Sequence, residues 1–153
     1  MKQRLDYRAA DPEIVKALVA LNTAIDKSGL ERKLLHLVKL RASQINGCSF
    51  CVDMHTREAR SDGETERRLY LVSAWRESPL FTDRERAAMA WTEALTTIAG
   101  REIGDELYEA TRAHFSEAEL VKLTAAIGMI NTWNRISISF RVIHPTDGAL
   151  EAA

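Results

Sequence analysis

The stretch "LVKLRASQINGCSFCVDMHTREAR" (37–60) is typical of two helices joined by a tight turn. The first helix is expected from about Glu31 to Ile45, because apolar residues recur there at helical spacing. Those that would face inward are Leu34, Leu35, Val38, Ala42 and Ile45. Asn46-Gly47 is a strong local breaker, so the second helix is expected from about Cys48 to Arg60. The only two cysteines of the chain therefore lie at the start of a helix.

The sequence on either side of this stretch is also helical in pattern. Only three prolines and seven glycines occur, and the glycines mostly separate periodic segments. Further helices are expected at about 12–27, around 69–75, from 82, at about 105–114 and from 116 to about 142. No internal repeat, low-complexity segment or composition shift marks a second domain. The pattern predicts an all-α, single-domain bundle of about six or seven helices over residues 1–153.

The first and last of these further helices have patterns that predict where they lie. The first follows Asp11-Pro12 and has an apolar stripe at helical spacing. The members of that stripe are Ile14, Leu18, Leu21 and Ile25. The last begins at a capping box, Ser116 to Glu119, and another capping box stands at Thr82 to Glu85. Its centre, "LTAAIGMI" (123–130), is apolar on every side, so we expect it to be the core around which the others pack.

Composition and charge exclude several classes of protein. Hydrophobic residues make up 46% and charged residues 28% of the 153, as in ordinary globular proteins. The 21 basic and 22 acidic residues are interspersed, whereas nucleic-acid or anionic-membrane binding would call for a basic patch. No apolar run suits a signal peptide or a membrane span. We expect a cytoplasmic protein, and in that compartment a close cysteine pair is more often catalytic or metal-binding than structural.

The cysteine stretch has the elements of dithiol chemistry. On a helix, Cys48, Cys51 and His55 fall on one face. Both thiols lie in the first turn, where free backbone N–H groups and the helix dipole favour a thiolate. His55 lies one turn beyond Cys51, where it can take or return a proton. The stretch thus predicts a redox pair in which one sulfur attacks an oxidant and the other closes a disulfide.

Two other interpretations compete with the redox pair. Buried cysteines often behave as small hydrophobes, but two of them three residues apart, alone in the chain, fit that interpretation poorly. A Cys2His2 zinc site would add His55 and His36, the latter on the preceding helix. The spacing is unlike structural zinc sites, which clip a loop between two ligand pairs. A metal-binding or redox-sensing oligomer without catalysis remains the alternative.

The run at 37–60 resembles the alkylhydroperoxidase D-like (AhpD-like) branch of the carboxymuconolactone decarboxylase family. Two later runs, "LVSAWRESPLFTDRERAAMAWTEALT" (71–96) and "INTWNRISISFR" (130–141), are similar to its peroxidase-related members. The resemblance covers about residues 14–142. It implies an all-α homo-oligomer, a trimer or hexamer, that reduces organic hydroperoxides by a peroxiredoxin-type, alkyl hydroperoxide reductase-like reaction. It also implies a separate thiol or disulfide electron donor, and no cofactor.

The resemblance assigns a role to each residue of the motif. Cys51 matches the cysteine that attacks the peroxide, Cys48 its resolving partner and His55 the histidine of the proton relay. The helix dipole alone would favour Cys48 as the attacking group, whereas proximity to His55 favours Cys51. The decarboxylases that name the family lack the paired cysteines, so the pair argues against that activity.

The chain departs from the family at His36, where a glutamate usually completes the proton relay. A histidine still carries protons, but it lacks the negative charge that raises the basicity of a neighbouring imidazole. His36 is therefore either a substitute relay group or a packing residue. A second departure is Phe50, where hydroperoxidases can carry a histidine; it gives the thiols an apolar approach.

Two C-terminal features complete the sequence expectations. A polar cluster follows the apolar centre of the last helix and consists of Asn131, Trp133, Asn134 and Arg135. We expect it to form a polar face where that helix leaves the core or meets a neighbouring subunit. The tail "HPTDGALEAA" (144–153) is expected to be poorly ordered unless a partner subunit holds it.

Overall fold

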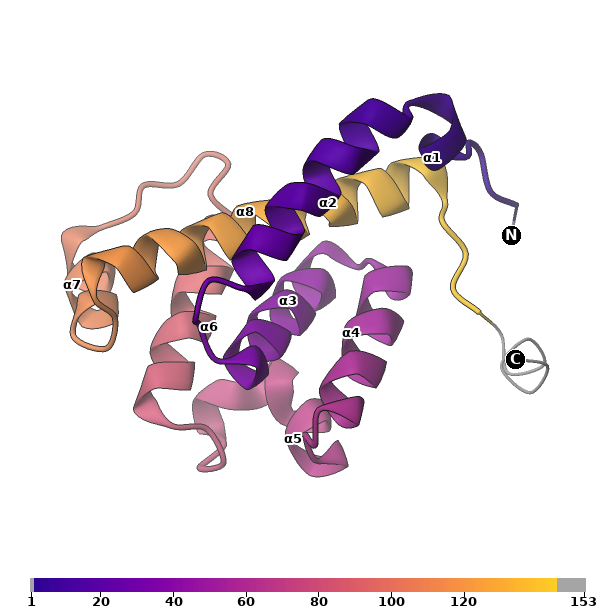
Figure 1. The fold of residues 1–153 in the computed structure, drawn as a ribbon. Coiled ribbons are helices and arrows are strands. Elements are labelled where there is room, and N and C mark those ends of the chain that lie inside the picture. Colours follow the sequence, from indigo (N-terminus) through magenta and orange to yellow (C-terminus); the bar gives the residue numbers. More distant parts are fainter. Residues whose placement is uncertain (1, 146–153) are drawn as a thin grey trace.

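Two layers of helices cross in the computed structural model, which describes residues 2–145 (Figure 1). The long α8 (Glu117–Phe140) and α2 (Pro12–Asp26) run side by side in one layer. The other layer holds α3 (Arg32–Asn46), α4 (Ser49–Ser61), α5 (Glu66–Leu71) and α6 (Asp83–Thr96). Shorter elements are α1 (Tyr7–Ala10), the 3-10 helix η1 (Val72–Glu77) and α7 (Asp105–Arg112). The all-α, single-domain prediction is confirmed.

The expected number of helices, six or seven, is slightly low. Among residues 2–145 there are eight α-helices. The missed helix is α1, a single turn that Asp6 caps by accepting hydrogen bonds from the N–H groups of Arg8 and Ala9. So short a segment carries no apolar periodicity, and hence no signal in the sequence. Most of the tail for which we expected poor order, residues 146–153, lies outside the described part of the chain.

The centre of the fold is α3 rather than α8. Every residue of α3 from Leu34 to Leu40 is buried, and the helix packs against α4, α6 and α8. By contrast, α8 has an exposed stripe that includes Val121, Thr124 and Gly128, so the prediction of a core helix buried on all sides is wrong. Small and apolar residues without charge made that stripe resemble a buried surface.

The apolar stripe of α2 is largely exposed in this single chain. Ile25 is buried, but Ile14 and Leu21 are 59% and 49% exposed. In this single chain α2 packs chiefly on one neighbouring helix, α8, which is too narrow to cover the whole stripe. An apolar face is left on the outside of the molecule.

The helix ends follow the local signals in the sequence. α3 ends at Asn46, and Gly47 takes the left-handed conformation (φ 69°) that closes a helix and that glycine adopts without a Cβ penalty. Both predicted capping boxes are present, at Thr82 with Glu85 and at Ser116 with Glu119. The turn at Gly47 then directs α4 back along α3, which brings the cysteines beside α8.

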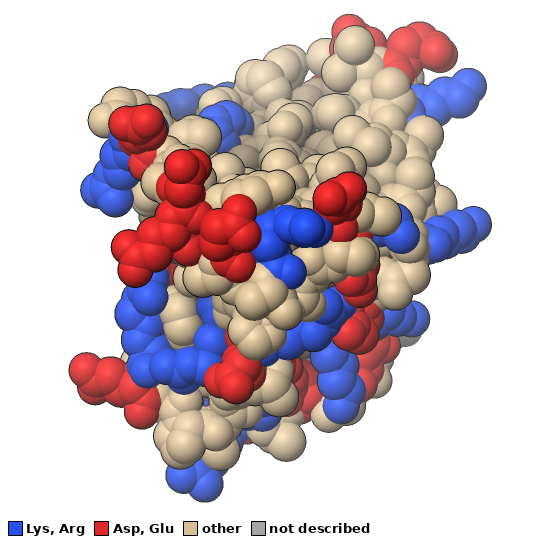
Figure 2. All heavy atoms as spheres, turned by 90° about the vertical axis from the view of Figure 1, so that its left-hand side faces the viewer, with Lys and Arg blue, Asp and Glu red and all other residues tan. Residues whose placement is uncertain are grey.

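The surface carries mixed charge. Figure 2 shows acidic and basic side chains interspersed on the face where α7 lies, without a patch of one sign there. None of the helices in the described residues has both the length and the apolar character needed to cross a membrane.

Candidate functional site

The first turn of α4 places the two cysteines together. Cys48 is the N-cap residue, and its sulfur accepts a hydrogen bond from the Cys51 backbone N–H at 3.4 Å. Neither forms a disulfide, and each is only 1% exposed. The sulfur of Cys48 therefore takes the position in which a serine or aspartate oxygen usually caps a helix, where a negative charge is stabilised.

A buried amide network fixes the turn that precedes Cys48. Asn46 donates from Nδ2 to Oδ1 of Asn131 (2.9 Å) and to Oδ1 of Asn134 (2.8 Å). Asn134 in turn donates to Oγ of Ser43 at 3.0 Å. The predicted polar face on this part of α8 is thus wrong for Asn131 and Asn134, which are buried and hold the α3–α4 turn, whereas Arg135 is exposed. Buried amides need partners, and the turn supplies them.

The two sulfurs are in direct contact. They lie 2.7 Å apart, within hydrogen-bond contact. This hydrogen bond lowers the pKa of Cys48 to about 6, against the opposing effect of burial. The same bond, together with burial, raises the pKa of Cys51. Of the two, Cys48 is therefore the thiol that loses its proton more readily. Ser137 Oγ lies 3.7 Å from the Cys51 sulfur.

His55 is buried beside this pair and has a carboxylate partner that the sequence analysis missed. Its Nδ1 lies 2.8 Å from Oε2 of Glu58, one turn further along α4. Burial lowers the pKa of His55, while the hydrogen bond to Glu58 opposes that shift. The neutral ring then donates from Nδ1 to Glu58 and keeps a lone pair on Nε2. Nε2 is buried and has no hydrogen-bond partner among the described residues.

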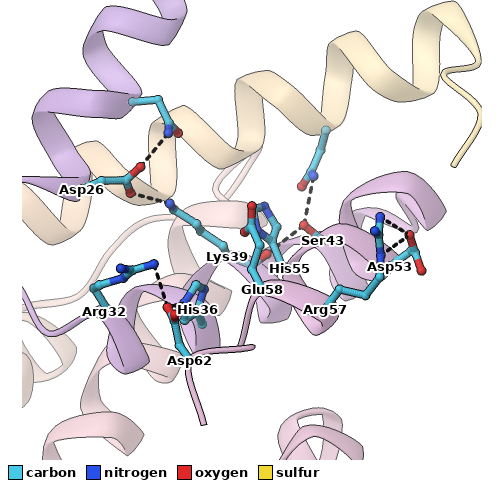
Figure 3. Close-up of polar contacts among 12 residues, drawn as sticks. Asp26, Arg32, His36, Lys39, Ser43, Asp53, His55, Arg57, Glu58 and Asp62 are labelled. Carbon is cyan, nitrogen blue, oxygen red and sulfur yellow. Dashed lines mark hydrogen bonds and ion pairs between the residues drawn. The ribbon is translucent and has the colours of Figure 1, made fainter. Parts of the chain in front are cut away.

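His36 is buried close to this region, but its hydrogen bond is directed elsewhere. Its Nε2 lies 2.6 Å from Oδ2 of Asp62, which also pairs with Arg32 at 2.8 Å (Figure 3). The hydrogen bond from His36 lowers the pKa of Asp62. Nδ1 of His36 is buried without a partner in the described part of the chain. Figure 3 also shows Lys39, which pairs with Asp26 at 2.7 Å, lying between that aspartate and His55.

A cavity of about 560 Å³ brings most of these side chains to one space. Cys51 lines it, whereas Cys48 does not. The predicted residues His55 and His36 both line it, as does Glu58. Its apolar lining consists mainly of Val19, Leu35, Phe50, Met54, Ile130 and Trp133. The cavity is thus large enough for an organic molecule and meets the sulfur pair at Cys51.

The Cys2His2 zinc alternative has little geometric support. Over residues 2–145, no three histidine, cysteine, aspartate or glutamate side chains are grouped so that they could hold a metal ion. His36 and His55 instead pair with separate carboxylates, those of Asp62 and Glu58.

Comparisons with known proteins agree with this fold. The model of the carboxymuconolactone decarboxylase family matches residues 12–94. The chain is 42% identical over 139 residues to an uncharacterized Bacillus subtilis protein, YdfG, and the match covers 91% of this chain and 95% of YdfG.

Solved structures extend the comparison. A protein from Agrobacterium tumefaciens, described as a candidate antioxidant defence protein AhpD, superimposes with a TM-score of 0.92. It is 53% identical, over 95% of this chain and all of that one. An uncharacterized peroxidase-related protein from a Silicibacter species has a TM-score of 0.79 over 91% of this chain and 73% of its own length. At 20% identity, the latter shows similarity of fold alone.

Proposed function

Because the chain belongs to the carboxymuconolactone decarboxylase family and has an AhpD-like fold, we propose that it is a thiol-dependent peroxidase for organic hydroperoxides. The observation that carries this proposal is the pair of cysteine sulfurs, 2.7 Å apart, at the wall of a cavity that His55 also lines. The description of the Agrobacterium protein, antioxidant defence, supports the same class of activity.

In the proposed first step, Cys51 attacks the hydroperoxide, because it is the sulfur that the main cavity reaches. A sulfur–oxygen bond forms at Cys51 and the oxygen–oxygen bond breaks. Nε2 of His55 takes the thiol proton and returns it to the departing alkoxide, so an alcohol is released and Cys51 becomes a sulfenic acid. Glu58 keeps the proton of the neutral ring on Nδ1, which leaves Nε2 as the base.

In the second step, Cys48 resolves the sulfenic acid. Its lowered pKa keeps Cys48 as a thiolate, which is the form that attacks sulfur. The new disulfide forms between the two sulfurs, and the hydroxide that leaves Cys51 takes up a proton to become water. The low pKa of Cys48, which on charge alone favours it as the attacking group, is thus equally suited to this resolving role. A thiol donor then reduces the disulfide.

We propose a secondary part for His36 in this cycle. It lines the same cavity, and its Nδ1 is buried without a hydrogen-bond partner in the described residues. Its other nitrogen is held by Asp62. With one nitrogen held by Asp62 and the other facing no partner, the ring can exchange a proton with a molecule bound in the cavity. The His55–Glu58 pair carries the main proton relay.

The protein is proposed to act as a homo-oligomer, a trimer or hexamer. The exposed Ile14 and Leu21 on α2 support association, because apolar side chains on one helix face are commonly covered by a partner. Light scattering on the purified protein measures the mass directly, and a monomer would contradict this part of the proposal.

Sulfenic acid trapping tests the assigned roles of the cysteines. With dimedone and cumene hydroperoxide, Cys48→Ser is expected to accumulate an adduct on Cys51, because the resolving thiol is absent. Cys51→Ser is expected to give little adduct on Cys48. A faster adduct on Cys48 in the second variant would reverse the two roles, and no adduct in either variant would contradict the peroxidase proposal.

A further inference from the structure

A second cavity meets the sulfur pair from another side. Its volume is about 340 Å³, and it touches Cys48 but not Cys51, whereas the main cavity touches Cys51 but not Cys48. Phe50 and Ser137 line both cavities and therefore lie between them. Each sulfur thus has an approach of its own.

The second cavity is cationic. Among the described residues its charged lining consists of Arg4 and Arg141, with no carboxylate, whereas Asp26 and Glu58 both line the main cavity. The backbone holds both arginines at the end of α8. Arg4 donates from its backbone N–H to the carbonyl of Phe140 (2.9 Å) and from Nη1 to that of Ser139 (3.0 Å). Arg141 is the left-handed C-cap of α8, with φ of 53°.

In disulfide exchange, the side from which a thiolate approaches determines which of the two cysteines it attacks. The attacking sulfur, the attacked sulfur and the leaving sulfur act along one line, so the direction of approach decides which cysteine leaves. A thiolate in the second cavity can reach Cys48 but not Cys51, so the bond that breaks releases Cys51. The leaving Cys51 then lies on the side of His55, which can supply its proton.

We propose that the second cavity is the entry site of the electron donor, a thiol that carries a carboxylate, and that this donor attacks Cys48. This inference rests on the proposed function, whose cycle requires a donor. The donor thiolate forms a disulfide with Cys48, the Cys48–Cys51 bond breaks, and Cys51 leaves and is protonated. A second donor thiol then attacks the mixed disulfide on the donor's sulfur, which releases the oxidised donor and returns Cys48 as a thiolate. Arg4 and Arg141 bind the carboxylate.

The charge of the donor provides the first test. The protein is oxidised with diamide, freed of excess reagent, and reduced with 3-mercaptopropionate, 2-mercaptoethanol or cysteamine, while the appearance of protein thiols is followed. Rates are divided by the thiolate concentration of each reagent, since only the thiolate attacks, and by the rate of the same thiolate with a small neutral disulfide, which removes differences in intrinsic nucleophilicity. The anionic thiol is expected to react about tenfold faster than the cationic one, with the neutral thiol between them.

Charge-neutral variants locate that preference. In the double variant Arg4→Gln, Arg141→Gln, reduction of the disulfide by 3-mercaptopropionate is expected to be about fivefold slower. The rate of reduction by 2-mercaptoethanol is expected to stay within about twofold of that of the unchanged protein. Arg101→Gln, which removes an exposed arginine outside both cavities, is the matched control and is expected to change neither rate. Equal rates for the three thiols, or an equal loss with the neutral thiol in the double variant, would overturn the proposal.

The point of attack provides an independent test. Quenching the reaction with iodoacetamide and mapping peptides by mass spectrometry is expected to find the donor on Cys48 and the alkyl group on Cys51. The donor on Cys51 would overturn the assignment. Diamide forms the disulfide without a peroxide, so these tests do not depend on the peroxidase reaction. A protein that prefers the anionic thiol but does not react with cumene hydroperoxide would contradict the peroxidase proposal alone.

Discussion

Glu58 accepts a hydrogen bond from Nδ1 of His55 at 2.8 Å and thereby provides a carboxylate for the imidazole beside the sulfur pair. The resemblance to AhpD-like proteins had left this chain without a relay glutamate, because His36 stands in its place. In the structure, the negative charge beside His55 comes from α4 itself, from Glu58 one turn further along that helix. The proton relay proposed for this protein is therefore carried by one helix.

Replacing Glu58 by Gln is expected to slow the reaction of the reduced protein with cumene hydroperoxide about tenfold or more, since His55 loses the negative charge that raises the basicity of its ring. The rate is measured by stopped-flow. Glu58 also raises the pKa of His55, so the lower limb of the pH–rate profile is expected to move to lower pH in the variant.

Asp53→Asn is the matched control for that variant. Asp53 is another carboxylate on α4, paired with Arg57 at 2.8 Å, and it lines neither cavity. Its loss is expected to leave the rate and the pH profile unchanged. An equal effect of both substitutions would mean that Glu58 acts only by stabilising the helix.

His36→Asn is expected to slow the peroxide reaction less than His55→Asn, by about threefold against a hundredfold, because the hydrogen bond of His36 goes to Asp62. His36→Glu, which restores the family residue, is expected to destabilise the fold, since it places a second carboxylate next to Asp62. A large gain in peroxide turnover in His36→Glu would show instead that the relay is impaired in this chain.

The low pKa of Cys48 depends on its neighbour. Cys51→Ala removes the hydrogen bond that contributes most to that shift, so the pKa of Cys48 is expected to rise from about 6 toward the ordinary value for a thiol. Thiolate absorbance in the ultraviolet, followed as a function of pH, gives both values. An unchanged pKa in the variant would place the cause in the helix start rather than in the sulfur pair.

The buried state of His55 also predicts a pH dependence of stability. Its pKa is lowered in the folded state, so the unfolded chain binds the proton more readily and stability falls as the pH drops below about 6.5. The slope is at most about 1.4 kcal/mol per pH unit for this one group. Urea unfolding between about pH 5 and 7 measures it, and a variant with Gln in place of His55 is expected to show a smaller slope.

Local features of this fold were predictable from the sequence, and those that depend on distant contacts were not. Gly47 and the capping boxes at Thr82 and Ser116 act within a few residues, so their signals are complete in the sequence. Which face of α2 or α8 is covered depends on what packs there. The exposed Ile14 and the exposed stripe of α8 therefore could not be told from core.

The same distinction holds in the site. Cys48, Cys51 and His55 were found because helical spacing places them on one face. Glu58 has the same kind of signal, three residues after His55, but such polar pairs are common on solvated helix faces. The second cavity gave no signal at all, since Arg4 and Arg141 meet at Cys48 only through the contact between the N-terminal segment and the end of α8.

A count of free thiols tests the central claim most directly. Reduced protein is mixed under anaerobic conditions with one equivalent of cumene hydroperoxide, and the thiols of the denatured protein are titrated before and after. The proposed cycle predicts that both thiols, Cys48 and Cys51, disappear together and that a thiol reductant restores both. Survival of both thiols, under conditions that oxidise another peroxidase, would contradict the account.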